Sequence, residues 1–192
     1  MREKNLLKQR ILEEAARLFV ERGYNGISMR EISEALKVSK AALYYHFKDK
    51  EALLLAILTG YLGEIETLLD VNCPPVQDAR TRLVHLVETI FNQPLERRAI
   101  IRLASQEIPS LRSEARQSFH ALYHQKFIGK IEAILQDGIE RAEFKPINVQ
   151  AAAWILLGMM YPFFYASPER DLQPGDPLIY MMTEIFLNGI AQ

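Results

Sequence analysis

The stretch "GYNGISMREISEALKVSKAALYYHFKDKEALL", residues 23 to 54, holds two short helical patterns separated by a turn of only a few residues. Ser28 followed by Glu31 is a capping-box pattern, because the serine hydroxyl accepts from the third amide and the glutamate reaches back. Ser39 can cap the second helix, which we expect to end near Phe47. This order predicts a helix-turn-helix motif over residues 27–47.

The second helix of this motif has two unlike faces. Leu43 and Phe47 fall one turn apart on a face that is typical of a core. The opposite face carries Lys40, Ala41, Tyr44 and Tyr45. Hydroxyls and ammonium groups can donate to phosphate oxygens, and small alanines let a helix approach base edges. The same pattern also fits a helical hairpin whose tyrosines lean over a neighbouring helix.

The complete stretch resembles the DNA-binding signature of the TetR (tetracycline-repressor-like) family. In that family a glycine-aromatic turn, a capped helix, "VS" and then "LY.HF..K..L" occur in this order. The resemblance implies backbone-positioning roles for Ser28, Tyr44, His46 and Lys50, and base-facing roles for Arg30, Lys40, Ala41, Ala42 and Tyr45. We add Ser39, the cap of the second helix, to this predicted DNA-binding set. The family also implies a double-stranded operator and a C-terminal domain that binds a ligand and dimerises.

Two lysines in this stretch need an explanation. A cation in the first turn of a helix is disfavoured by the helix dipole, so Lys50 is easier to understand if a phosphate lies there. A solvated lysine is the alternative. Lys37 stands where family members often have glycine, and it would cost on the order of 1 kcal/mol if its backbone is left-handed.

The rest of the chain is also helical in pattern and shows no convincing strand. We expect about nine helices in an all-α fold. A DNA-binding domain would span residues 1–50, and a regulatory and dimerisation domain would span residues 51–192. The predicted helices cover residues 5–22, 28–36, 40–47, 49–70, 77–92, 96–107, 110–137, 148–166 and 177–190.

Charge is distributed unevenly along the chain, although the formal net charge is only -1. Residues 1–50 hold 11 basic against 7 acidic residues, whereas residues 51–192 hold 12 against 17. The basic excess therefore coincides with the predicted motif. The charged N-terminal segment does not resemble a secretory signal, and a single cysteine, Cys73, fits a reducing compartment. We expect a cytoplasmic protein without a cofactor.

Residues 151–166 form an apolar run that is too short, and too interrupted by Pro162, for a membrane span. A helix that is apolar on every side must be covered on every side, so this helix and the one at 177–190 are expected to pair with a second copy. A monomer with a large core is the alternative. The predicted interface residues are Trp154, Leu157, Tyr161, Ile185 and Phe186.

A small-molecule effector is expected in the larger domain, in an apolar pocket between helices. The predicted ligand-binding residues are Phe91, Arg102, Tyr123, Phe127, Trp154, Met159 and Tyr161. Aromatic and methionine side chains at helical spacing also fit a plain core. Arg102 lies in an apolar sequence, where a buried arginine would need Glu88, Glu107 or a ligand carboxylate as partner; the helix surface is the alternative.

The sequence gives little support for an enzyme active site. His120 and His124 stand one turn apart, but no HExxH arrangement or third metal ligand accompanies them, so we predict neither a metal site nor an enzyme. We expect a repressor that binds a palindromic operator as a homodimer and is released by a small, mainly apolar molecule. The alternatives are an architectural DNA-binding dimer without a ligand and a helical enzyme.

Overall fold

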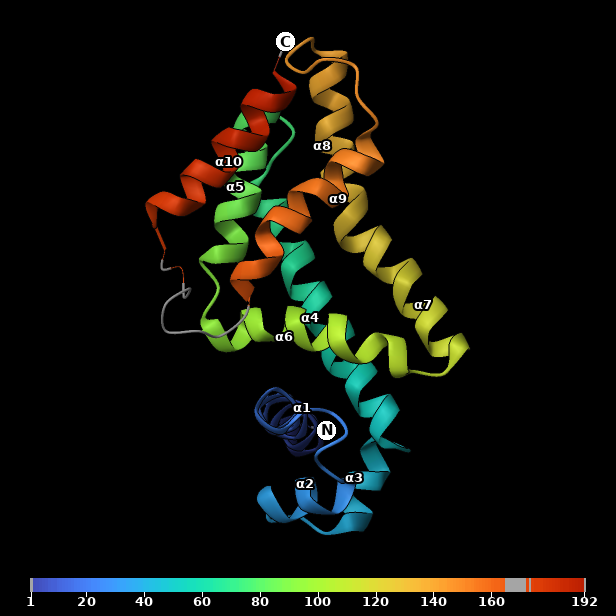
Figure 1. Ribbon diagram of the computed structural model, residues 1–192. Helices are drawn as coiled ribbons and strands as arrows, with labels where there is room; N and C mark the ends of the chain where they lie inside the picture. The colour runs from blue at the N-terminus through green and yellow to red at the C-terminus, as the bar shows by residue number, and fades with distance from the viewer. Residues whose placement is uncertain (1, 165–171, 173, 192) are drawn as a thin grey trace. The chain divides into compact units, whose positions relative to one another are not determined.

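The computed structural model describes residues 2–164, 172 and 174–191. Within these residues it contains ten α-helices and no strand, and several of the helices run on into short 3₁₀ or π turns. Figure 1 shows how the α-helices follow one another along the chain. Because α7, a π-helical turn and α8 follow one another without a break, the chain forms nine continuous helical segments in this part. The α-helices are α1 (Arg2–Arg22), α2 (Met29–Ala35), α3 (Lys40–His46), α4 (Lys50–Asn72), α5 (Ala79–Phe91), α6 (Leu95–Glu107), α7 (Ser113–Tyr123), α8 (Gly129–Glu140), α9 (Val149–Met160) and α10 (Pro177–Ile190).

Local capping explains where the first helices begin. The amide of Ser28 donates to Glu31 at 2.8 Å and the amide of Glu31 donates to the Ser28 hydroxyl, which confirms the capping box of α2. The amide of Ala42 donates to the hydroxyl of Ser39 at 3.1 Å, so Ser39 caps α3 as predicted. The carboxylate of Asp49 accepts in the same way from the amide of Ala52 at 2.7 Å, at the start of α4.

The turns between these helices use left-handed backbone. Gly23 ends α1 with a φ of 76°, a conformation that costs glycine little. Lys37 adopts a φ of 56° in the turn between α2 and α3. The backbone at Lys37 is therefore left-handed, the geometry usual for glycine. The Cβ of the lysine makes this conformation less stable by on the order of 1 kcal/mol.

The described residues divide into two compact units. Unit 1 comprises residues 1–61 and 99–120, and unit 2 comprises residues 62–98 and 121–192. The predicted boundary at residue 50 coincides with the start of α4, whereas the compact units divide within α4, α6 and α7.

Unit 1 packs the inner faces of its short helices around a small apolar core. Within it α2 contacts both α1 and α3, as Figure 1 shows. The fully or almost fully buried side chains here include Ile11, Ala15, Phe19, Ile32, Leu43 and Phe47. Leu43 and Phe47 thus form the inner face of α3, as their spacing predicted.

Unit 2 is built around α5, which packs against both α8 and α10, while α9 contacts α8 and α10 (Figure 1). The buried side chains of α5 include Leu83, Leu86, Val87 and Ile90. Residues 165 and 166, which the sequence assigned to the helix of α9, lie outside the described residues. The described part of that helix continues after Met160 as a 3₁₀ turn over Tyr161–Phe164.

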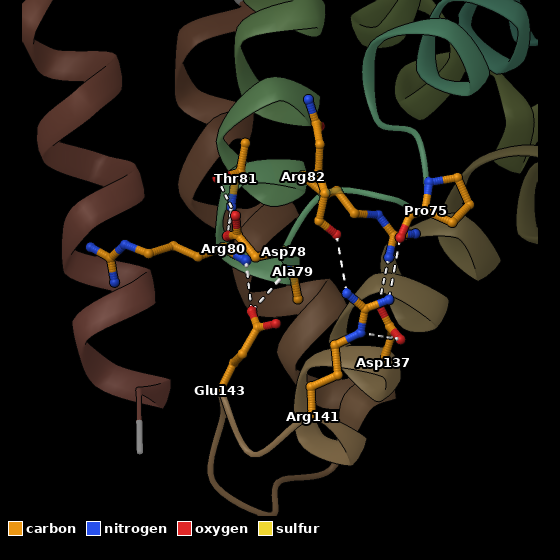
Figure 2. A network of polar contacts seen from close by, with 10 residues as sticks. Pro75, Asp78, Ala79, Arg80, Thr81, Arg82, Asp137, Arg141 and Glu143 are labelled. Atoms are coloured by element: carbon orange, nitrogen blue, oxygen red, sulfur yellow. Dashed lines mark hydrogen bonds and ion pairs between the residues drawn. The ribbon is translucent and has the colours of Figure 1, made fainter.

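Polar contacts within unit 2 fix the loop before α5 (Figure 2). Glu143 accepts from the amide of Ala79 at 2.8 Å, so a carboxylate from beyond α8 lies at the start of α5. Arg141 donates to the carbonyl of Pro75 at 3.2 Å and to Asp137 at 3.0 Å. Asp137 also binds the buried Arg82 at 2.8 Å, so one carboxylate joins α5 and the end of α8.

The single helix predicted at 110–137 is continuous from Ser113 onward, but its hydrogen-bonding pattern changes in the middle, which the sequence did not indicate. A π-helical turn over His124–Ile128 separates α7 from α8. Such turns insert one extra residue per turn and rotate the side chains that follow, and they occur often at functional sites.

By length and composition alone, α4 could cross a membrane, but its most apolar window is 44% buried inside the protein, which is typical of a core helix. The only cysteine, Cys73, follows α4 and is also buried. Burial raises the pKa of its thiol to about 11.

Candidate DNA-binding site

The outer face of α3 presents large polar aromatics to solvent. Tyr44 and Tyr45 are 50% and 66% exposed, although a tyrosine side chain normally buries most of its ring. Lys40 and Ala41 are also exposed, whereas Ala42 and His46 are half-buried. Because Leu43 and Phe47 hold the opposite face in the core, α3 is fixed with this polar face outward.

Exposed lysine side chains lie in α3 and in the turns on both sides of it. Lys37, Lys40 and Lys48 are exposed, and none of the three has a salt-bridge partner among the side chains that the structure describes. In unit 2, by contrast, Arg97, Lys126 and Lys130 each pair with a carboxylate. Free lysines beside an exposed helix face are what a duplex phosphate backbone requires. The sequence prediction omitted Lys37 and Lys48, although their place in the two turns that flank α3 could have indicated them.

The remaining predicted residues lie close to α3 but already have internal contacts. The hydroxyls of Ser28 and Ser39 serve as helix caps, and Arg30 forms an exposed ion pair with Glu34 at 2.7 Å. The capping hydrogen bonds of Ser28 lower the pKa of Glu31. Ser28 and Ser39 therefore stabilise the shape of the motif. Arg30 can leave its exposed ion pair with Glu34 and contact a base edge, because an exposed ion pair contributes little free energy.

Lys50 has a structural role that was not apparent from the sequence. Its Nζ donates to the carbonyl of Tyr24 at 2.8 Å and to that of Ile27 at 3.0 Å, and it lies 4.3 Å from the centre of the Tyr24 ring. The lysine thus ties the α1–α2 turn to the start of α4. A phosphate is not needed to explain a cation at this helix end, so its contact with DNA stays a prediction.

Two family models match this chain and together cover both of its parts. Residues 11–57 match the bacterial regulatory proteins of the tetR family, and residues 76–162 match the tetracyclin repressor-like C-terminal domain. The chain belongs to the TetR family. Proteins of this family are transcriptional regulators and not enzymes, so the prediction that the chain is not an enzyme is confirmed.

Individual TetR-family proteins resemble the chain over different lengths. The HTH-type transcriptional repressor DhaR of Mycobacterium sp. (strain GP1) is 30% identical over 92 residues, which are 45% of this chain and 46% of that protein. The crystal structure of the regulator PfmR from Thermus thermophilus has a TM-score of 0.80 and 29% identity, covering 95% of this chain and 100% of PfmR. AibR, crystallised with isovaleryl coenzyme A and operator DNA, has a TM-score of 0.79 and 25% identity, covering 93% of this chain and 96% of AibR.

Four of the predicted ligand-binding residues of this TetR-family chain come together in unit 2. The rings of Tyr123 and Phe127 are 5.6 Å apart, and Tyr161 lies 6.3 Å from Phe164, which stacks on Phe91 at 5.6 Å. Burial and the neighbouring Tyr161 raise the pKa of the Tyr123 hydroxyl, so the two tyrosines are close. We call these five side chains the aromatic cluster.

The other predicted ligand-binding residues lie elsewhere. Trp154 is exposed on α9, Met159 is half-buried, and Arg102 is a half-buried residue of unit 1. A cavity of about 280 Å³ opens in unit 2, but it contains none of the predicted residues. Its lining consists of Glu88, Asn92, Pro174, Gly175, Ile179 and Tyr180.

The deeply buried arginine of α6 is Arg98, one turn before the predicted Arg102. Arg98 is 2% exposed, and its guanidinium lies 5.8 Å from the Phe91 ring centre, beside the aromatic cluster. It donates to the carbonyls of Gln93 at 3.1 Å and Leu172 at 2.9 Å. No signal in the sequence distinguishes the two arginines, because both stand beside the same apolar residues.

The residues predicted for the dimer interface differ in their exposure within the protomer. Trp154 and Ile185 are exposed at 56% and 59%, and Tyr161 is half-buried, but Leu157 and Phe186 are buried inside the protomer at 8% and 6%. Successive helix residues point about 100° apart, so Phe186 faces away from its neighbour Ile185. The exposed large apolar side chains of α9 and α10 are Trp154, Ile155, Tyr180, Met181 and Ile185.

The histidine pair considered as a metal site is not part of a larger cluster. His124 lies 3.2 Å from the carboxylate of Glu132. Over the described ranges, no group of three or more histidine, cysteine, aspartate or glutamate side chains could hold a metal ion.

Proposed function

We propose that the protein is a ligand-responsive transcriptional repressor of the cytoplasm, which binds a palindromic operator as a homodimer and is released by a small, mainly apolar molecule. The observation that carries this proposal is the outer face of α3, with its exposed tyrosines and uncommitted lysines. The structural likeness to AibR, which was crystallised with operator DNA, supports the same assignment.

On this proposal, α3 lies in the major groove. Ala41 and Ala42 let its backbone come close to the bases, while Tyr45, Lys40 and Arg30 reach base edges. Tyr44, His46 and the flanking lysines contact phosphates. Two copies related by a two-fold axis would read half-sites separated by about one helical turn of DNA or a multiple of it.

Selection of bound sequences from a pool of random duplexes tests this function directly. We expect an inverted repeat to be enriched. Arg30→Lys keeps the charge but loses the planar fork that binds two acceptors, so it is the matched control for Arg30→Ala. Both variants should relax the preference at one position per half-site by roughly tenfold. A pool without any enriched sequence would contradict the proposal.

Homodimerisation is proposed through the exposed apolar side chains of α9 and α10. Trp154 and Ile155 of α9 and Met181 and Ile185 of α10 are large apolar side chains that the protomer itself leaves exposed. Apolar surface of this kind marks protein-protein contacts, and a two-fold axis would place the same patch of each copy against the other.

The proposed effector site is the aromatic cluster. Its rings offer stacking surface and two tyrosine hydroxyls, which suits a mainly apolar molecule with few polar groups. Phe91 and Phe164 stack with an interplanar angle of 28°, and Arg98 adds a positive charge beside them. The related structure of AibR holds isovaleryl coenzyme A together with operator DNA.

Coupling between effector and DNA is proposed to run along α6. One end of this helix carries Arg98 beside the aromatic cluster, and the other carries Glu107, whose carboxylate accepts from the amide of Tyr24 at 3.4 Å. Tyr24 is in the α1–α2 turn that Lys50 also holds. A ligand can release DNA only if it binds more tightly to the form that does not bind the operator.

A panel of hydrophobic compounds, tested by thermal melts and by operator titration, checks the effector proposal. We expect at least one compound to raise the melting temperature and weaken operator binding together. Tyr123→Ala should lessen both effects, while Val76→Ala, at an exposed residue of unit 2 outside the aromatic cluster, should leave the melting shift unchanged. A compound that stabilises the protein without affecting the operator would contradict the proposed coupling.

A further inference from the structure

The start of α1 lies against the exposed face of α3. The ammonium group of Lys4 donates a hydrogen bond to the hydroxyl of Tyr45 and lies 4.6 Å from the centre of its ring. Tyr45 is the more exposed of the two adjacent tyrosines. Two segments that are 41 positions apart in the sequence therefore meet at the proposed DNA-reading surface.

The inner stripe of α1 changes character along the helix. Residues spaced three or four apart share one face, so Lys4, Lys8, Ile11 and Ala15 form one stripe. Ile11 and Ala15 are completely buried in the core of unit 1, whereas Lys4 and Lys8 are exposed. The first two turns of α1 thus extend beyond the core. If this part of the helix served only to pack against protein, its inner face would be apolar, but it carries two lysines instead.

Neither lysine has a carboxylate partner among the described side chains. Farther along the same helix Arg17 pairs with Glu14 at 2.6 Å and with Glu21 at 2.7 Å, so the helix does place acidic residues where a cation needs one. Lys4 and Lys8 instead repel each other across one helical turn. Residues 1–10 hold four basic residues and one acidic residue, the densest positive charge in unit 1.

We propose that Lys4 and Lys8 bind backbone phosphates beside the segment that α3 reads, so that the start of α1 forms a second, sequence-independent contact with the duplex. The inference rests on the proposed DNA-binding function. Lys4 has a second effect, because its hydrogen bond holds the Tyr45 ring on the same side as the lysines. The partner chemistry is the phosphodiester backbone and not a base edge.

The double variant Lys4→Ala/Lys8→Ala tests the inference by fluorescence anisotropy with two probes, a short duplex of random sequence and the duplex enriched by selection. Between roughly 50 and 200 mM salt, each lost phosphate contact lowers the magnitude of the salt slope by about 0.9. We expect a decrease of about 1.8 per bound protomer and an equal fold-loss of affinity for both probes. Since both lysines are exposed, the melting temperature should not change.

Two controls separate phosphate binding from other effects. Lys145→Ala removes an exposed lysine from unit 2 and should leave the salt slope unchanged. Tyr45→Phe removes the hydroxyl that accepts from Lys4 but keeps the ring. The two single variants, Lys4→Ala and Lys8→Ala, are measured in the same assay. If Tyr45→Phe and Lys4→Ala lowered the salt slope equally and Lys8→Ala had no effect, Lys4 would act only by orienting the tyrosine, and the phosphate contact would be refuted.

The outcome for the wild-type protein separates this inference from the function on which it rests. Salt-dependent binding by the wild type together with an unchanged slope in the double variant would overturn the role of Lys4 and Lys8 alone. Absence of binding to either duplex by the wild type would overturn the DNA-binding function itself.

Discussion

Arg112 holds the carboxylate of Glu51 by two donors at once. Its Nε donates to one oxygen at 2.6 Å, and its backbone amide donates to the other at 3.1 Å. Glu51 is in the first turn of α4, and Arg112 immediately precedes α7. The pair therefore fastens the segment after α6 to the helix that follows α3, within unit 1.

These donors make the stability of the protein depend on acid pH through Glu51. The hydrogen bonds from Arg112 lower the pKa of Glu51 in the folded state. The unfolded state therefore takes up the proton first, near the ordinary carboxyl pKa of about 4.3. The stabilisation is complete above that pH and is lost as pH falls through the lower folded pKa.

We expect Arg112→Ala to return the pKa of Glu51 toward its ordinary value and to remove this acid-range stabilisation. Carbon NMR titration of the Glu51 carboxyl, with urea unfolding at several pH values, measures both. Arg17→Ala is the control, because Arg17 pairs with Glu14 and Glu21 instead. An identical Glu51 titration in wild type and Arg112→Ala would show that the contact does not persist in solution.

Lys37→Gly should raise the free energy of unfolding by about 1 kcal/mol, because glycine adopts a positive φ without a Cβ penalty. The same substitution at Ala142, which has a φ of 58°, should stabilise by a similar amount. Only Lys37→Gly removes a free charge beside α3, so only this variant should also weaken binding to random duplex DNA. Urea denaturation and anisotropy titration check the two effects, and equal DNA affinities would speak against a role for Lys37 at the interface.

Gly138→Ala should destabilise unit 2 by about 1–3 kcal/mol through overpacking. A Cβ at this position would lie 2.3 Å from the Phe144 ring and 2.8 Å from the Cβ of Ala79. Gly63→Ala is the matched control, since nothing lies within 4 Å of its Cβ, and alanine should stabilise this helix by about 1 kcal/mol. Chemical denaturation of both variants gives the comparison; a stable Gly138→Ala protein would mean that Phe144 can move aside.

Ile155→Glu and Ile185→Glu should each convert the proposed dimer into a folded monomer, because a carboxylate would be buried without a partner at the contact between copies. Sedimentation measures the mass, and circular dichroism verifies that the helices remain. Phe186→Glu should instead unfold unit 2, since Phe186 is buried within the protomer. Val76→Glu changes an exposed apolar residue outside α9 and α10 and should leave the dimer intact. A monomeric wild-type protein at micromolar concentration would contradict the proposed interface.

The helices of the motif could be predicted because their signals are local. Ser28, Glu31 and Ser39 lie within a few residues of the amides that they cap, so the sequence alone determines where α2 and α3 begin. The outward face of α3 followed from the spacing of Leu43 and Phe47 in the same way.

Features that depend on distant segments could not be predicted. Arg98 and Arg102 lie on the same helix among similar neighbours, and Arg98 is the buried one, beside the Phe91 ring and the carbonyl of Leu172. The burial of Leu157 and Phe186 within the protomer could not be predicted for a related reason, since a helix that is apolar on all sides does not reveal which side its own protomer covers. Lys50 finds its carbonyl partners more than twenty positions away, in a turn whose geometry the sequence does not reveal.

Because its only thiol, that of Cys73, is buried, the protein contains an internal probe of local unfolding. With a pKa of about 11 and little exposure, the sulfur of Cys73 is protonated and inaccessible at neutral pH, so alkylating reagents should react only with molecules in which the end of α4 has opened. Labelling rates would then report the opening free energy of unit 2 without an engineered cysteine. Adding operator DNA or an effector to the same assay would reveal whether a change at one unit alters the opening of the other.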